Sequence, residues 1–95
     1  MGKDAYIYFM TNSNNAVLYI GVTSNLERRV WEHKNDINPN SFTGKYKCHK
    51  LVCFEHTNDM KAAIAGEKQL KNWKREWKNK LIEKQNPEWA DLSVD

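Results

Sequence analysis

Long apolar segments are absent from this sequence. Its 95 residues contain no stretch that approaches the roughly 20 consecutive apolar residues of a transmembrane helix. Residues 1–6 carry one lysine and one aspartate, and no apolar run typical of a secretory signal peptide follows them. We therefore expect a protein without membrane association, in the reducing environment of the cytoplasm.

Cysteine is scarce, with only two residues, Cys48 and Cys53. They lie five positions apart and lack the paired spacing and companion ligands of a zinc site. Cys53 stands within the apolar run LVCF, which favours a reduced thiol buried in a strand.

The chain also lacks linkers, internal repeats and low-complexity segments, so residues 1–95 are expected to form a single domain. A hydrophobic content of 40% is enough for a core. The net charge is only +3, but between residues 67 and 84 seven Lys and Arg stand against three Glu, a local excess of four positive charges. This segment fits either a polyanionic partner or a solvated helix face, and charge alone leaves both open.

Two short apolar runs at Ala5–Thr11 and residues 17–22 flank an asparagine-rich segment, which predicts a β-hairpin. Gly21 lies near the end of the second strand, where a bend or a close approach of another group is expected. A helix is predicted from about Asn25, capped by Thr23 or Ser24.

The second half of the sequence predicts a surface loop over residues 35–44 and a third strand over residues 50–56. A helical pattern over residues 59–84 is expected to break near residues 73–75 into two helices, with Trp73 and Trp77 on a core-facing side. The predicted order is ββαβαα, an α+β domain built on a small three-stranded antiparallel sheet flanked by helices.

The residues between positions 8 and 33 suggest chemistry on phosphate. Arg29 and His33 are four positions apart and project from one face of the predicted helix. A guanidinium can hold two phosphate oxygens and an imidazole can move a proton near neutral pH. Arg28 is adjacent to Arg29, so only one of them can face a cleft. Tyr8 and Tyr19, on neighbouring strands, could point into the same cleft or simply belong to the core.

The same residues carry a resemblance to a known family. Tyr6-Ile7-Tyr8 and Tyr19-Ile20-Gly21 resemble the GIY-YIG signature, with Tyr6 in the first glycine position. The following helix with Arg29 and His33, the segment 67–71 and the segments 81–82 and 86–89 resemble later elements of small stand-alone GIY-YIG endonucleases. The match covers nearly the whole chain, in order.

This resemblance implies the GIY-YIG fold and a metal-dependent endonuclease that hydrolyses phosphodiester bonds. The implied partner is nucleic acid, above all DNA, and the implied process is DNA repair or recombination. It implies a general base at Tyr8 and one ligand for Mg²⁺ or Mn²⁺ at Glu67. Glu67 alone would be a surface charge paired with Lys71. The implied catalytic residues are Tyr8, Tyr19, Arg29, His33 and Glu67.

Further residues are candidates for substrate contact. Lys45 is a candidate cation for activating Tyr8, and Arg28 is a candidate phosphate contact on the helix surface. Lys68 and Lys71 flank the implied glutamate. Asn86 either positions the scissile phosphate or caps a turn before Pro87. The alternative to an enzyme is a nucleic-acid-binding module of the same fold with weak or lost activity, since 95 residues leave no room for a specificity domain.

Overall fold

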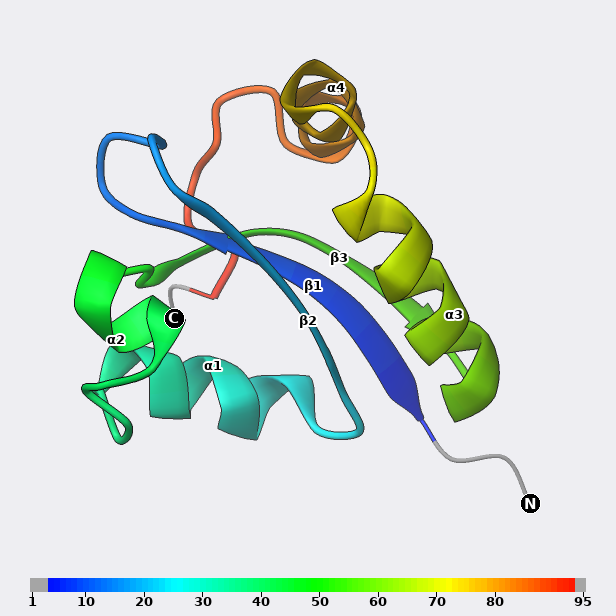
Figure 1. Ribbon diagram of the computed structural model, residues 1–95, viewed down its shortest axis with the longest axis horizontal. Helices are drawn as coiled ribbons and strands as arrows, with labels where there is room; N and C mark the ends of the chain where they lie inside the picture. The colour runs from blue at the N-terminus through cyan, green and yellow to red at the C-terminus, as the bar shows by residue number, and fades with distance from the viewer. Residues whose placement is uncertain (1–3, 94–95) are drawn as a thin grey trace.

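Three antiparallel strands form the centre of the protein (Figure 1), whose computed structural model describes residues 4–93. The central strand β1 (Ala5–Thr11) pairs on one side with β2 (Leu18–Thr23) and on the other with β3 (Lys50–Thr57), giving the order β2-β1-β3. The Asn12 side chain accepts hydrogen bonds from two backbone amides of the hairpin loop, which explains the asparagines there. The predicted hairpin and three-stranded sheet are confirmed.

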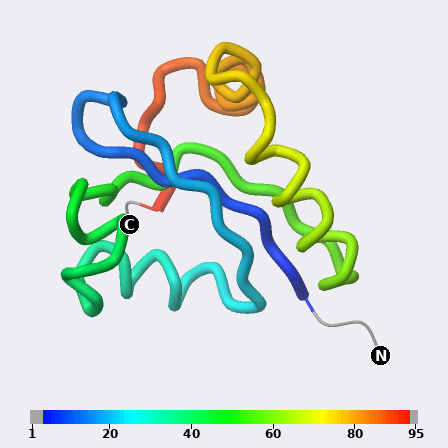
Figure 2. Tube along the Cα trace, viewed as in Figure 1, coloured from blue at the N-terminus to red at the C-terminus, as the bar shows by residue number. Residues whose placement is uncertain are grey.

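Within residues 4–93, helices cover both faces of the sheet, and the tube in Figure 2 shows this arrangement. Helices α1 (Leu26–Lys34) and α2 (Phe42–Tyr46) lie on one face, and α3 (Met60–Lys71) and α4 (Arg75–Gln85) lie on the other. Asn25 caps α1 by accepting from the backbone amide of Arg28, so the predicted cap at Thr23 or Ser24 is wrong by one or two positions. None of the helices within residues 4–93 has the length and apolar composition to cross a membrane.

Helix α2 begins inside residues 35–44, where the sequence predicted only a surface loop, so this prediction is wrong in part. Ser41 caps the helix by accepting from the backbone amide of Gly44, and Thr43 and Gly44 are buried. A Cβ at Gly44 would lie 2.6 Å from the carbonyl oxygen of Asn38, so only glycine fits there. Five residues are too few to produce a helical hydrophobic period, which is why the sequence did not reveal α2.

The alternation of side chains along β1 creates two separate cores. Ile7 and Phe9 face α3 and α4, whereas Tyr8 and Met10 face α1. A β-bulge in the pairing of β1 with β3, between Phe9 and Met10, places both Val52 and Cys53 in the first core. Cys53 is a free, buried thiol, as the sequence predicted, and burial raises its pKa to about 11.

The long helical pattern breaks where the sequence predicted, between Lys71 and Arg75. Trp73 lies in this break and packs against the core, but Trp77 is 53% exposed, so the expected core stripe is wrong at Trp77. The reason is that Trp73 is outside both helices, and the four-residue spacing places side chains on one face only along a continuous helix.

The segment after α4 returns to the sheet, as predicted. Trp89 is buried and its indole donates to Glu83, and the backbone amide of Leu92 donates to the Leu51 carbonyl. The Asn86 amide donates to the carbonyls of Val52 (3.1 Å) and Ala90 (2.7 Å). Its side-chain oxygen accepts from the Ala90 backbone amide at 3.1 Å. These bonds favour the structural interpretation of Asn86 over a phosphate contact.

We predict that Asn86→Ala destabilises the fold without a direct effect on nucleic-acid binding. The substitution removes three hydrogen bonds and leaves the buried Val52 carbonyl without its donor, which should cost about 2–3 kcal/mol. Urea unfolding measures this loss, and anisotropy titrations at a temperature where the variant is folded measure affinity. A variant of normal stability with weakened binding would instead support the phosphate contact.

Candidate active site

The site begins with the packing of Tyr8 against Gly21. The two residues are directly opposite each other in the register of β1 and β2. A Cβ at Gly21 would lie 2.5 Å from the Tyr8 hydroxyl oxygen and 2.6 Å from its Cζ atom, so the ring occupies the space that any other side chain would need. The close approach expected at Gly21 is therefore that of the Tyr8 ring, which is completely buried.

Helix α1 places His33 over this ring. Val30 anchors the helix in the same core as Tyr8, and one turn further His33 Nε2 lies 2.9 Å from the Tyr8 hydroxyl oxygen. The ring of Tyr19 lies next to both, with its centroid 6.1 Å from that of Tyr8 and 5.5 Å from that of His33. The structure thus brings these three side chains together on one face of the sheet.

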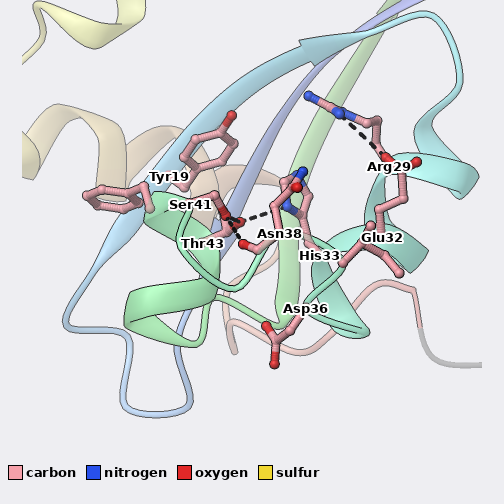
Figure 3. A pocket seen from close by; sticks show the side chains of 10 residues that line it. Tyr19, Arg29, Glu32, His33, Asp36, Asn38, Ser41 and Thr43 are labelled. Atoms are coloured by element: carbon pink, nitrogen blue, oxygen red, sulfur yellow. Dashed lines mark hydrogen bonds and ion pairs between the residues drawn. The ribbon is translucent and has the colours of Figure 1, made fainter.

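Arg29 also faces this cluster, whereas Arg28 points outward. The Arg28 side chain is 75% exposed and that of Arg29 is 44% exposed. Glu32 accepts a hydrogen bond from Arg29 and forms an ion pair with Arg28, with each N–O distance 3.4 Å. Figure 3 shows Arg29 and Glu32 beside each other at the rim of the site, with His33 further in.

A pocket of about 160 Å³ opens next to these side chains (Figure 3). Its walls come from β2, α1, the following loop and the start of α2. The lining residues are Tyr19, Arg29, Glu32, His33, Asp36, Ile37, Asn38, Ser41, Phe42 and Thr43. Three of the five implied catalytic residues, Tyr19, Arg29 and His33, line it. The buried Tyr8 is connected to the pocket by its hydrogen bond with His33.

The protonation states in the site follow from burial and charge. Burial raises the pKa of Tyr8, and the neighbouring Tyr19 raises this pKa further, while Arg29 opposes the shift. Burial lowers the pKa of His33, and the Arg29 cation lowers it further. At neutral pH Tyr8 is therefore a phenol and His33 is a neutral imidazole. The cation that acts on Tyr8 is Arg29, so the expectation that Lys45 has this role is wrong.

A chain of hydrogen bonds fixes which nitrogen of His33 carries the proton. The Ser41 hydroxyl lies 2.7 Å from the Asn38 carbonyl oxygen and must donate its only proton to it. In the 3.2 Å contact between the two hydroxyls, Thr43 is therefore the donor to Ser41. Thr43 then has no proton left for His33 Nδ1 at 2.9 Å, so this nitrogen donates. In the neutral ring Nε2 therefore carries no proton, and the Tyr8 hydroxyl donates its hydrogen bond to Nε2.

Sequence reasoning missed Ser41 and Thr43, although both lie in the walls of the pocket. The signal in the sequence was Ser41, a residue type that caps helices, followed two positions later by a second hydroxyl residue, Thr43. It was weak because the helix it caps has only five residues.

The remaining predicted residues lie outside this pocket. Glu67 belongs to α3 on the opposite face of the sheet, where its side chain is 16% exposed and pairs with Lys71 at 3.3 Å. Lys68 and Lys71 are exposed on the same helix, and Lys45 is exposed on α2. In the basic segment, Arg75 donates to the carbonyls of Asn15 and Ala16, so its charge serves to attach α4 to the hairpin loop.

A metal ion in this protein would depend on few ligands. Within residues 4–93 no group of three or more His, Cys, Asp or Glu side chains is arranged to hold a metal. The carboxylate of Glu67 is a ligand of the hard-oxygen type that Mg²⁺ and Mn²⁺ accept, and Mg²⁺ commonly binds through one or two carboxylates, with water and phosphate oxygens completing its shell. The donor chemistry therefore fits a substrate-dependent ion rather than a resident one.

A three-stranded α+β fold with two tyrosines, a histidine and an arginine gathered at one pocket is the arrangement expected of the GIY-YIG class of domains. The chain belongs to the GIY-YIG family: the family model described as the GIY-YIG catalytic domain matches residues 4–81. The GIY-YIG family is a nuclease family, and its nucleases generally depend on divalent metal ions.

Relatives of similar length match this chain over most of its sequence. The chain is 35% identical to a UPF0213 protein of Syntrophus aciditrophicus over 83 residues, which cover 87% of this chain and 93% of that protein. It is 35% identical to a UPF0213 protein of Haloquadratum walsbyi over 82% of this chain and 85% of the relative. The solution NMR structure of the UPF0213 protein BH0048 from Bacillus halodurans has the same fold, with a TM-score of 0.58, 20% identity and coverage of 97% and 99% of the two chains.

We predict that Thr43→Val changes the tautomer of His33. Valine has nearly the same shape but offers no acceptor to His33 Nδ1, so the ring should shift towards the tautomer with its proton on Nε2. Thr43→Ser keeps the hydroxyl and should preserve the original tautomer. Nitrogen-15 NMR of the imidazole distinguishes the two forms. An unchanged spectrum in Thr43→Val would show that the hydroxyl chain does not set the tautomer.

Proposed function

We propose that this protein is a metal-dependent endonuclease that hydrolyses phosphodiester bonds in DNA. The observation that carries the proposal is the buried Tyr8–His33 hydrogen bond beside an accessible arginine in one pocket. A structural tyrosine does not require a neutral imidazole with a fixed tautomer, whereas proton transfer from a nucleophile does.

The proposed reaction moves one proton along this pair. A water oxygen attacks phosphorus, the bond to the leaving sugar oxygen breaks, and this oxygen takes a proton from solvent water. As the water attacks, the Tyr8 oxygen takes up its proton and passes its own proton to His33 Nε2. The imidazolium that forms keeps its Nδ1 proton donated to Thr43. Transfer in this direction avoids a free phenolate, which the raised pKa of Tyr8 makes costly.

Arg29 is proposed to bind the non-bridging oxygens of the same phosphate. Its guanidinium lines the pocket and its contact with Glu32 is long, at 3.4 Å, so little is lost when it turns to a substrate. Its departure from the Tyr8 ring would also open the path by which water reaches the phenol oxygen. Tyr19, which lines the pocket next to His33, is proposed to orient this water.

Glu67 is proposed to hold the divalent ion. When bound, the ion supplies positive charge that neutralises the phosphate and the leaving oxygen. The Glu67 side chain is only 16% exposed, but its partner Lys71 is 53% exposed and can turn into solvent, which frees the carboxylate for the ion. Lys68, Lys71, Arg28 and Lys45 are exposed cations and are proposed to contact the backbone of the nucleic acid. We leave the buried Asn86 out of this set.

A second candidate function is a binding module without catalysis. The observation that favours it is the position of Glu67, which lies across the sheet from the pocket and is paired with Lys71. In that case the basic surface would bind nucleic acid electrostatically, and metal ions would have no effect on the integrity of the substrate.

We predict opposite effects for the two neighbouring arginines. Arg29→Ala should lower the cleavage rate by at least about a hundredfold, the scale for removal of one electrostatic stabiliser, with little loss of affinity. Arg28→Ala, the matched control, should mainly weaken binding. Plasmid nicking and anisotropy titrations measure the two quantities. Inactive Arg28→Ala together with active Arg29→Ala would refute the assignment.

The test of the proposed function is the dependence of cleavage on Mn²⁺ for the wild type and Glu67→Gln. Glutamine keeps the size and hydrogen-bonding capacity of the side chain but removes its charge, so the variant should fold and bind DNA yet cleave at least about a hundredfold more slowly. Glu76→Gln, an exposed carboxylate at the start of α4, is the matched control and should cleave normally.

Two results would contradict the proposal in different ways. Normal cleavage by a stably folded Glu67→Gln would place the ion elsewhere. Absence of cleavage by the wild type on plasmid, branched DNA and RNA at all Mg²⁺ and Mn²⁺ concentrations would favour the binding module.

A further inference from the structure

A row of aromatic side chains leads from the pocket to the surface. Tyr19 on β2 is followed by Phe42 and Tyr46 on α2, with ring centroids 6.0 Å and 4.8 Å apart. We call Tyr19, Phe42 and Tyr46 the aromatic strip. Its inner members, Tyr19 and Phe42, line the pocket, so the strip is continuous with the candidate active site.

The outer part of the strip is open to solvent. Phe42 is 45% exposed and Tyr46 is 50% exposed, although burial of large aromatic side chains contributes much free energy to folding. Both are held by a helix that is firmly attached, because Thr43 and Gly44 are buried beneath it. The rings are therefore a preformed surface.

The charges around the strip suit a polyanion. Both carboxylates that line the pocket are already paired: Glu32 with the two arginines of α1, and Asp36 with His49 and Lys47. Lys45 is exposed on the same helix as the rings. Cations next to open aromatic faces are the combination found where single-stranded nucleic acids bind.

We propose that the aromatic strip stacks unpaired nucleobases next to the reacting phosphate, so that the preferred substrate contains a single-stranded segment. The faces of paired bases inside a duplex are covered by their neighbours, whereas unpaired bases can lie on aromatic rings. The inference rests on the proposed function in one respect only, the position of the phosphate in the pocket. Binding to the strip itself does not require catalysis.

The test is an anisotropy titration in EDTA, which prevents metal-dependent cleavage. The probes are a fluorescein-labelled single-stranded DNA oligonucleotide, the RNA of the same sequence and the blunt DNA duplex. The variants Phe42→Leu, Tyr46→Leu and their combination keep an apolar side chain but remove the ring. Phe42→Trp keeps a ring. Trp31→Leu removes an aromatic side chain that is 58% exposed on α1, outside the strip and the pocket, and serves as control.

We expect each leucine substitution to weaken binding of the single-stranded probe by at least about fivefold, the lower end of a base-stacking contribution. Duplex affinity should change by less than about twofold, because phosphate contacts remain. Phe42→Trp should bind at least as tightly as the wild type, and Trp31→Leu should bind normally. Comparison of the DNA and RNA probes shows which of the two the strip prefers, and thermal melts check folding.

Several outcomes would overturn the inference. Unchanged single-strand affinity in the double variant, or an equal loss for single strand and duplex, would remove the strip as a stacking surface while leaving the nuclease proposal intact. Failure of the wild type to bind any probe would defeat both proposals. If sedimentation shows a dimer that Phe42→Leu/Tyr46→Leu dissociates, the strip is an interface between copies of this chain.

Discussion

The burial of one phenol hydroxyl constrains most of this structure. A buried hydroxyl needs a hydrogen-bond partner, and Tyr8 finds it in His33 at 2.9 Å. Its ring fits only because Gly21 has no side chain, and His33 reaches it only because Val30 fixes the rotation of α1. The signature residues of two strands and the histidine of the next helix are thus parts of one packing arrangement.

The same arrangement fixes the protonation and charge of the groups in the pocket. The hydroxyl chain ends at the backbone carbonyl of Asn38, which can only accept, so every proton in it has one possible direction. Both carboxylates in the wall are paired with cations, Glu32 with the arginines of α1 and Asp36 with Lys47, which leaves the pocket compatible with a phosphate. Helix α2, which the sequence did not reveal, therefore sets the protonation of His33 and Tyr8, which the family signature identifies.

The sheet separates the two parts on which the proposed chemistry depends. Tyr8 and His33 belong to the core on one face, and Glu67 belongs to the helix packed on the other. In the proposed enzyme, substrate and ion would have to connect them around the edge strand β2, which α3 also contacts. This separation agrees with an ion that depends on substrate phosphate for part of its coordination.

The sequence by itself predicted the strands and the break between α3 and α4, because periodicity is a local property. The family signature, which is also local, selected Tyr8, Tyr19, Arg29 and His33 as site candidates, and the structure brings these four side chains close together. The sequence did not determine the role of Asn86, the exposure of Trp77, the existence of α2 or the participation of Ser41 and Thr43. These depend on which surfaces meet when the chain folds. Tertiary packing alone decided that Thr43 lies under His33 while Glu67 lies across the sheet, because contacts between distant segments leave no periodic trace in the sequence.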